Sequence, residues 1–173
     1  MPAYDIYVTL DTALGPAFVV FNAEGVCRVA PGEDAGEFEA DFEARFGRPL
    51  RRGTSLPPAL RATPVPVDWR DVSPFDRAVL AVTQRIPHGQ TRTYREVAER
   101  IGRPKAMRAV GSALARNRVP LLVPCHRVVR SDGTIGDFAF GAPAKRALLE
   151  SEGVALPAPR AAGAQRPAVR LTA

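Results

Sequence analysis

The fold of this chain is decided by residues 93–116, which read TYREVAERIGRPKAMRAVGSALAR. Thr93 and Glu96 have the spacing of a capping box, in which each side chain accepts a hydrogen bond from the other residue's backbone N–H, so a short helix is expected to begin here. Gly102 is typical of a helix end, and Pro104 is typical of the first turn of the next helix. The stretch therefore predicts a helix-turn-helix.

The second helix of this motif combines basic and small side chains. The basic residues are Lys105, Arg108 and Arg116, and the small ones are Ala106, Ala109, Gly111 and Ser112. Small residues let a helix approach another surface closely, and that surface is either the helix's own domain or DNA. The pattern alone leaves both interpretations open.

Upstream of the motif, Ser73 and Pro74 predict the start of another helix, with Ser73 as its N-cap. Its apolar residues at helical spacing are Phe75, Val79, Val82 and Ile86. The preceding residues 48–70 contain five prolines, which exclude long regular structure and indicate a linker wrapped on the surface.

The N-terminal part has alternating apolar residues separated by turn residues. The expected elements are strands at residues 5–10, 17–21 and 26–29 and a helix at residues 37–46. Phe38, Phe42 and Phe46 would share one face of that helix. Downstream of the motif, the expected elements are an extended apolar run at residues 119–123, a strand at 127–130 and a last helix at 143–152.

The fold class is therefore α+β. The expected organisation is an N-terminal α/β domain over residues 1–70 that includes the linker, a mainly helical domain over residues 73–154, and a flexible tail over residues 155–173. We expect a monomer, because no long apolar helix face is left to pair.

Charge is unevenly distributed. Residues 1–72 hold 7 basic and 11 acidic residues, a net charge of −4, whereas residues 73–173 hold 17 and 7, a net charge of +10. The second half is therefore the part expected to meet a polyanion. The chain shows no apolar run of about 18 residues and no secretory signal pattern, so a cytoplasmic protein without a membrane segment is expected.

Two cysteines, Cys27 and Cys125, exclude a disulfide framework and a zinc-binding cluster. Cys27 lies in an ordinary strand pattern. Cys125 lies in Pro124-Cys125-His126-Arg127-Val128 and is either a buried small hydrophobe or a nucleophile. A nucleophile needs a base, because a thiol pKa of about 8.5 leaves little thiolate at neutral pH.

His126 is the candidate base. Adjacent residues on an extended strand point to opposite sides, so contact with Cys125 requires a bend, which Pro124 favours, or a bridging water. A carboxylate would orient the imidazole, and Glu150 and Glu152 are the candidates.

These residues together resemble the O6-alkylguanine-DNA alkyltransferases. The resemblance covers roughly residues 74–154 and is carried by Tyr94, Arg108-Ala109-Val110-Gly111, Asn117, Pro124-Cys125-His126-Arg127-Val128, Lys145, Leu148-Leu149 and Glu152-Gly153. More weakly, Leu14-Gly15-Pro16 and Glu24-Gly25-Val26-Cys27 resemble the family's small ribonuclease-H-like domain. The family fold also implies that the helix-turn-helix is of the winged-helix type.

The resemblance implies single-turnover repair, in which Cys125 keeps the alkyl group from O6 of guanine as a thioether. His126 would take the thiol proton through a water, and Glu152 would hold His126. Asn117 would brace the active-site segments, and Tyr94 would donate a proton toward N3 of the departing base.

The resemblance also implies that the partner is double-stranded DNA containing O6-alkylguanine, bound through the minor groove with the lesion rotated out of the stack. Arg108 would fill the gap left in the stack. The other residues expected to contact DNA are Lys105, Ala109, Gly111, Ser112 and Arg127. No cofactor and no metal are expected, because the DNA itself is the alkyl donor.

Two departures from the family pattern stand out. The loop usually reads Gly-(Gly/Asn)-Tyr-x-Gly-Gly, and here Phe138 lacks a hydroxyl and Phe140 replaces a glycine. The residues expected to line the substrate pocket are Val128, Phe138, Ala139 and Phe140. We therefore predict a tight pocket that accepts O6-methylguanine and discriminates against O6-benzylguanine. Arg118 stands where the family commonly has proline, which is expected to loosen the turn before the active site.

Three other functions would each require a different set of residues. A non-catalytic helix-turn-helix sensor of alkyl lesions would keep Arg108 and the basic surface without needing Cys125, His126 and Glu152 together. A regulatory protein of the two-domain adaptive-response type would need a zinc-binding cysteine cluster. A cysteine hydrolase would need a second histidine or an evident oxyanion loop.

Overall fold

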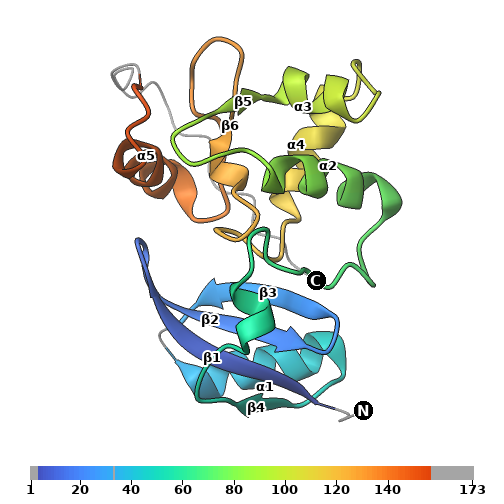
Figure 1. The fold of residues 1–173 in the computed structure, drawn as a ribbon, viewed down its shortest axis with the longest axis vertical. Helices are drawn as coiled ribbons and strands as arrows, with labels where there is room; N and C mark the ends of the chain where they lie inside the picture. Colours follow the sequence, from blue (N-terminus) through green and yellow to red (C-terminus); the bar gives the residue numbers. More distant parts are fainter. Residues whose placement is uncertain (1–3, 33, 157–173) are drawn as a thin grey trace.

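The computed structural model describes residues 4–32 and 34–156, and most of the predicted tail over residues 155–173 lies outside them. An N-terminal sheet with one helix lies below a mainly helical part in Figure 1, and the chain passes from one to the other through residues 53–73. The coarse expectation of an α+β fold is therefore confirmed. Among the described residues, no helix has the length and apolar character needed to cross a bilayer.

The N-terminal sheet has the strand order β3-β2-β1-β4. Its strands are β1 (Asp5–Thr12), β2 (Gly15–Asn22), β3 (Gly25–Pro31) and the short β4 (Leu50–Arg52). The first three strands pair antiparallel, as expected from their alternation and turns, whereas β4 pairs parallel with β1.

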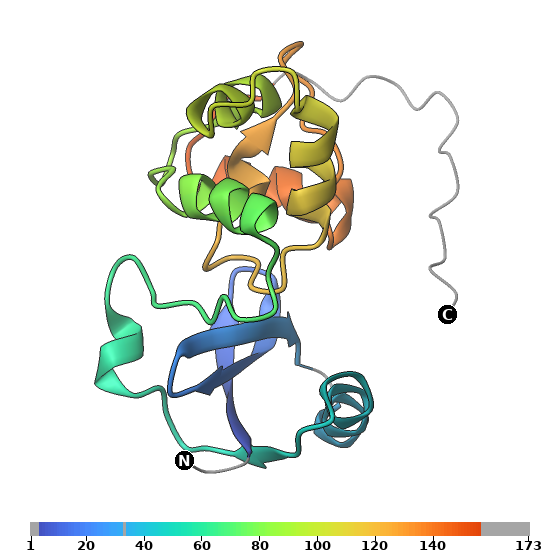
Figure 2. The same ribbon diagram turned by 90° about the vertical axis from the view of Figure 1, so that its right-hand side faces the viewer.

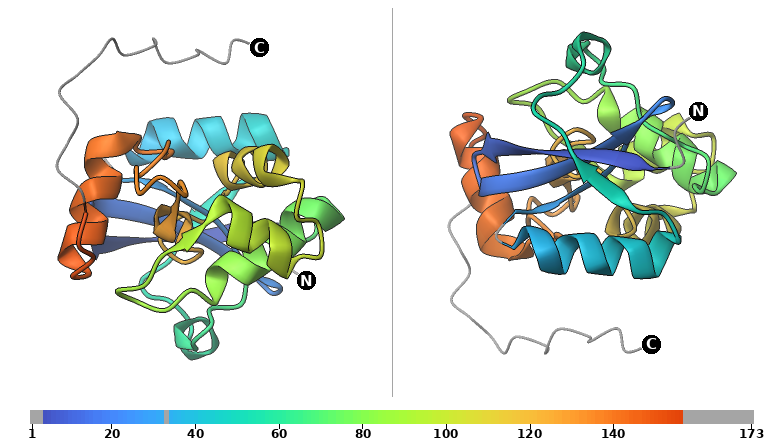
Figure 3. Two further views of the ribbon diagram at one scale, coloured as in Figure 1. Left: turned by 90° about the horizontal axis from the view of Figure 1, so that it is seen from above. Right: turned by 90° about the horizontal axis from the view of Figure 1, so that it is seen from below.

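The two faces of this sheet are covered by different segments of the chain. Helix α1 (Ala35–Phe46) covers one face, where Phe38 and Phe42 are buried against Tyr7 and Phe18. The predicted phenylalanine stripe is confirmed, with Phe46 packed at its margin. Residues 53–70 lie on the opposite side of the sheet from α1 in Figure 2 and in the right-hand view of Figure 3.

The expectation that residues 48–70 form only a surface linker is wrong in three places. β4 extends the sheet, and Val67 forms a bridge with Val26 and is buried. A 3-10 helix over Pro58–Arg61 also buries Leu60. The density of prolines correctly excluded long helices and strands. The short strand pairings depend on contacts with distant strands, so the local sequence shows no pattern that predicts them.

The second part contains four α-helices and a small parallel pair of strands. They are α2 (Pro74–Gln84), β5 (Arg92–Thr93), α3 (Tyr94–Arg100), α4 (Met107–Ala115), β6 (Val128–Val129) and α5 (Gly141–Ser151). The N-cap at Ser73 and the capping box of Thr93 and Glu96 are both confirmed. Both predictions succeeded because capping is a local interaction.

Two predicted elements differ in the structure. Helix α4 begins at Met107 rather than at Pro104, because residues 103–106 form a turn in which the Ala106 N–H donates to the Arg103 carbonyl. Residues 119–123 are not extended: the Val123 N–H donates to the Val119 carbonyl, and Leu121 has a φ of 73°. This turn folds the chain back toward α4 just before the cysteine segment.

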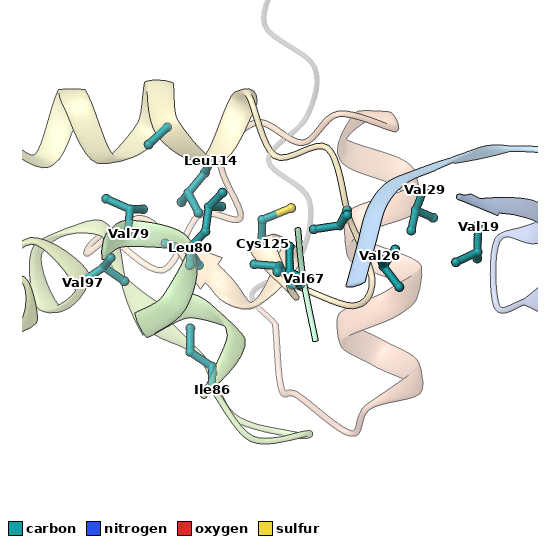
Figure 4. Packing of buried hydrophobic residues seen from close by; sticks show 14 of the residues in the cluster. Val19, Val26, Val29, Val67, Val79, Leu80, Ile86, Val97, Leu114 and Cys125 are labelled. Atoms are coloured by element: carbon teal, nitrogen blue, oxygen red, sulfur yellow. The ribbon is translucent and has the colours of Figure 1, made fainter. Parts of the chain in front are cut away.

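One hydrophobic core runs through both parts of the molecule. It joins Val79, Leu80 and Leu114 of the helices to Val26 and Val29 of β3. Figure 4 shows Cys125 lying among these side chains, between the helices and the sheet. The cysteine segment is therefore held from both sides.

Candidate active site

Cys125 begins a 3-10 turn that extends to Arg127, which supplies the bend that Pro124 led us to expect. The Cys125 N–H donates to the Val123 carbonyl at 2.7 Å, and the Arg127 N–H donates to the Pro124 carbonyl at 2.9 Å. The turn sends consecutive side chains in different directions. Cys125 lines a cavity, whereas His126 reaches Glu152 at the end of α5.

The cavity has a volume of about 770 Å³ and opens to solvent. It lies between α3 and α4 on one side and residues 130–139 on the other. The residues that line it are Tyr94, Arg95, Met107, Arg108, Gly111, Ser112, Leu114, Ala115, Cys125, Arg130, Ser131, Asp132, Asp137, Phe138 and Ala139. Its size is within the range of small-molecule sites, and a flat base with its sugar is small enough to enter it.

The Cys125 sulfur accepts a hydrogen bond from Asn117. The Asn117 Nδ2 lies 3.2 Å from Sγ and 3.0 Å from the Val123 carbonyl oxygen, and its Oδ1 accepts from the Val119 N–H at 3.0 Å. Burial raises the pKa of the Cys125 thiol, and the hydrogen bond from Asn117 and the charge of Lys145 oppose that rise. Asn117 and Lys145 thus favour the thiolate in a site that otherwise disfavours it.

Lys145 was given no role in the sequence-based prediction, yet it is completely buried. Its Nζ donates to the Val128 carbonyl at 2.6 Å and to the Asp137 carbonyl at 3.3 Å, and burial lowers its pKa to about 8. The spacing of Lys145 with Leu148 and Leu149 on α5 was a usable signal, because i, i+3 and i+4 share one helix face.

His126 and Glu152 form a buried pair. His126 Nε2 lies 2.7 Å from Glu152 Oε1, and their side chains are 3% and 7% exposed. Burial lowers the pKa of His126 even though Glu152 opposes the shift, so the imidazole is neutral at neutral pH. Because Nε2 faces a carboxylate, we assign the proton to Nε2, which leaves Nδ1 as the basic nitrogen. This Nδ1 is buried and has no hydrogen-bond partner within the described part of the chain.

Glu152 also binds Arg127. Arg127 donates to its two carboxylate oxygens at 2.8 and 2.9 Å, and the Gly89 N–H adds a donor at 3.2 Å. Burial alone would raise the pKa of Glu152, but the donors from Arg127, His126 and Gly89 outweigh it and lower the pKa to about 2. Of the two carboxylates that the sequence left open, Glu152 contacts His126, whereas Glu150 pairs with Arg146 on the surface.

The structure corrects the placement of Arg127. We expected a DNA contact, but its side chain is 15% exposed and donates to Glu152 and to the Ile86 carbonyl at 2.7 Å. A guanidinium engaged in a buried bidentate pair is not available to phosphates. Arg127 therefore belongs to the support of the histidine and not to an outer basic surface.

Tyr94 lies at the start of α3 with its phenol in the cavity wall. Glycines at two positions make room for it: a Cβ at Gly111 would lie 3.7 Å from the ring, and one at Gly136 would lie 3.0 Å from the hydroxyl oxygen. Burial, followed by the charge of Asp137, raises the pKa of Tyr94. The phenol therefore keeps its proton at neutral pH and is a hydrogen-bond donor.

The other predicted residues divide between the cavity and its surroundings. Arg108, Gly111 and Ser112 of α4 line the cavity, and so do Phe138 and Ala139. Outside this lining, Lys105 and Ala109 are exposed in the turn and on α4. The cavity wall also includes residues that the sequence did not single out, among them Arg95, Met107 and Arg130.

Two predicted pocket residues lie elsewhere. Val128 is fully buried in the core, because β6 pairs with β5 and its carbonyl accepts from Lys145. Phe140 is absent from the lining formed by the described residues and packs on Phe138, with 5.5 Å between ring centroids. Phe138 in turn lies edge-on to His126 at 6.2 Å. Phe140 therefore lies behind a residue of the cavity wall, Phe138, and not in the wall itself.

Residues 74–154 match the family model described as 6-O-methylguanine DNA methyltransferase, DNA binding domain. The chain is 44% identical over 157 residues to the methylated-DNA--protein-cysteine methyltransferase of Mycobacterium bovis, covering 88% of this chain and 94% of that protein. It is 35% identical over 159 residues to the bifunctional transcriptional activator/DNA repair enzyme Ada of Escherichia coli, covering 84% of this chain.

The chain spans about half the length of several of the curated relatives it matches, including 45% of Ada. Among solved structures, the Mycobacterium tuberculosis OGT in complex with DNA superposes with a TM-score of 0.65 at 28% identity, covering 85% of this chain and 92% of that one.

Proposed function

The chain belongs to the 6-O-methylguanine DNA methyltransferase family, and from this premise we propose that it repairs O6-alkylguanine in duplex DNA by moving the alkyl group to Cys125. O6-methylguanine is the main expected substrate. The observation that carries the proposal is the position of the Cys125 thiol, which faces an open cavity shared with Tyr94 and Arg108 while the His126–Glu152 pair lies behind it.

The transfer is a displacement at the alkyl carbon. The thiol proton passes through a water to Nδ1 of His126, and the sulfur forms a bond to the carbon as the bond from carbon to O6 breaks. The electron pair of the broken bond stays on guanine, which gains a proton from Tyr94 at N3. The thioether has no ready leaving reaction, so each molecule acts once.

The helix-turn-helix formed by α3 and α4 is proposed to bind the duplex DNA. O6 lies inside the stacked duplex, so the nucleotide is rotated out at a cost of a few kcal/mol, and Arg108 fills the space it leaves. Gly111 and Ser112 let α4 approach the minor groove, and Lys105 and Ala109 lie on the exposed side next to them. Binding should depend on salt and little on sequence, because phosphate contacts supply most of it.

Several finer assignments belong to this proposal. The N-terminal domain over residues 1–70 is taken as ribonuclease-H-like, and the domain over residues 73–154 as a winged-helix-like alkyltransferase domain whose small sheet is β5 and β6. Asn117 braces the cysteine segment, and Arg127 supports Glu152. A monomer in the cytoplasm is the expected state, and the free thiols of Cys27 and Cys125 suit a reducing compartment.

The test is the intact mass of the protein after mixing with a duplex that holds one O6-methylguanine. One methyl group in place of a proton adds about 14 Da, and this gain is expected with the lesion duplex but not with an unmodified one. Cys125→Ala should abolish the gain. Cys27→Ala is the matched control and should retain it, because burial raises the pKa of Cys27 to about 12.

An unchanged mass with retained binding to the lesion duplex would contradict the proposal. In that case the non-catalytic sensor of alkyl lesions would be the better description.

The range of alkyl groups should depend on Phe138. The ring of Phe138 lines the same cavity as Cys125 and takes up space there, so we expect benzyl transfer at least about tenfold slower than methyl transfer. Phe138→Ala should reduce this difference by speeding benzyl transfer, measured as single-turnover rates on the two duplexes. Equal rates for methyl and benzyl in the unmodified protein would remove the idea of a tight pocket.

A further inference from the structure

Arg118 joins the N-terminal domain to the chain that carries the active site. Its carbonyl accepts a hydrogen bond from the Val29 N–H of β3 at 2.7 Å. Its guanidinium carbon lies 5.6 Å from the centre of the Phe46 ring on α1, and its Nη2 lies 3.4 Å from the Asp71 carbonyl oxygen. One residue is thus held by a strand, a helix and the segment between the domains.

The residues on either side of Arg118 are buried and belong to the cysteine site. The Val119 N–H donates to Asn117 Oδ1, and this bond fixes which way the Asn117 amide is turned. With Oδ1 engaged, the amide nitrogen faces the Val123 carbonyl and the Cys125 sulfur. Movement of the chain at Arg118 would therefore turn the donor away from the thiol.

We infer that Arg118 is a positioning residue for alkyl transfer: anchored on β3 and α1, it keeps the Asn117 amide directed at the Cys125 sulfur. The effect on transfer rests on the proposed function, whereas the effect on the thiol does not. The sequence suggested that Arg118 loosens this turn, but its contacts restrain the turn instead.

A DNA-binding role for Arg118 fits the structure less well. Its side chain is 40% exposed, but the guanidinium lies against Phe46 and Asp71 rather than beside the cavity. Arginine favours such a position because its planar group stacks on an aromatic ring, which lysine does less well. Arg45 offers a matched comparison, since it lies on the same helix as Phe46 but pairs with Asp41 and does not reach Asn117.

The experiment uses the full chain carrying Cys27→Ser, so that Cys125 is the single thiol. The rate of its alkylation by iodoacetamide is followed against pH, which yields the apparent pKa of Cys125. Single-turnover methyl transfer and duplex binding are measured in parallel. For Arg118→Ala we expect an apparent pKa higher by about 0.5 to 1, because the thiolate loses part of its hydrogen bond.

Methyl transfer by Arg118→Ala should be about three- to tenfold slower, with the duplex Kd within about twofold of the parent. Arg118→Lys should raise the pKa of Cys125 less than Arg118→Ala does. Arg45→Ala should change neither the pKa of Cys125 nor the rate of methyl transfer. Phe46→Leu should raise the pKa of Cys125 in the same direction. The double variant Phe46→Leu with Arg118→Ala should have nearly the same Cys125 pKa as Arg118→Ala alone, because both substitutions remove the same contact between Arg118 and Phe46.

An unchanged pKa and rate together with a lower Tm would overturn the inference and leave Arg118 as an interdomain contact only. A weaker duplex Kd with an unchanged pKa would overturn it in favour of a DNA contact. If the parent accepted no methyl group but Arg118→Ala still raised the pKa of Cys125, the proposed function would fail while the positioning role stood.

Discussion

Glu152→Gln is expected to slow methyl transfer by about 100-fold or more, the range associated with loss of a general base. The carboxylate holds the proton on His126 Nε2, which leaves Nδ1 free to accept the proton of Cys125. A glutamine amide facing Nε2 would favour the other tautomer, with the proton on Nδ1. His126 would then be present but unable to act as the base.

The same substitution should destabilise the fold by about 3 to 5 kcal/mol, as for other buried pairs that lose one partner. Arg127 and the Gly89 N–H both donate to this carboxylate, so their donors would be left poorly paired. Thermal unfolding and single-turnover rates should be measured at a temperature where the variant is folded. Arg127→Ala should also slow transfer, but it should leave the salt dependence of duplex binding unchanged.

Glu150→Gln is the matched control, because Glu150 lies two residues before Glu152, within α5, and its side chain pairs with Arg146 at the surface. It should transfer methyl at the parental rate and unfold within about 0.5 kcal/mol of the parent. A Glu152→Gln variant that is folded and transfers methyl within threefold of the parent would show that transfer does not need the Glu152 carboxylate to hold the proton on His126 Nε2.

Glu152 also predicts how stability depends on pH. Its pKa in the folded protein is about 2, below the ordinary value of 4.5, so its stabilising contribution is complete above about pH 4.5. The contribution is lost as the pH falls through 4.5 toward 2, and the shift corresponds to about 3 kcal/mol. The stability difference between the parent and Glu152→Gln should therefore narrow between pH 5 and pH 3, as measured by chemical unfolding.

Tyr94→Phe is expected to slow methyl transfer by about 30- to 1000-fold, which corresponds to about 2 to 4 kcal/mol for one donor directed at developing charge. The ring of Tyr94 packs against Gly111, and the substitution leaves that packing intact. Only the hydroxyl is removed from the cavity wall. Duplex binding should therefore remain within about threefold of the parent, since phosphate contacts supply most of the affinity.

Tyr7→Phe is the control for this prediction. The Tyr7 hydroxyl donates to Glu39 in the N-terminal domain, far from the cavity lining, so its loss should leave the transfer rate unchanged. If Tyr94→Phe transferred methyl as fast as Tyr7→Phe, proton donation by Tyr94 would be excluded. A large loss of duplex affinity in Tyr94→Phe would instead indicate a role in binding the flipped base.

Much of the local structure could be predicted from the sequence. The start of α2 at Ser73 and of α3 at Thr93 followed from capping side chains, and the buried face of α1 followed from the spacing of Phe38 and Phe42. These features depend on residues within one or two turns of each other. The cysteine, its neighbouring histidine and the bend between them were also indicated by adjacent residues.

The partners within the site could be predicted only in part. The choice between Glu150 and Glu152 depends on where the end of α5 lies relative to His126, 26 residues earlier. The burial of Lys145 and the engagement of Arg127 with Glu152 were not anticipated, because an isolated basic residue is usually solvent-exposed. Val128 was placed in the pocket, although strand pairing buries it.

By itself, then, the sequence determined most of the longer helices and strands, two helix caps and the candidate reactive groups, because capping, turn formation and periodicity act between near neighbours in the chain. The tertiary structure alone decided the pairing of β4 with β1, the turn at residues 119–123, the hydrogen bonds around Glu152 and the anchoring of Arg118 on Val29 and Phe46. These contacts join residues far apart in sequence, and they stabilise the protein only once the two domains have packed into one core. No local sequence pattern can therefore predict them.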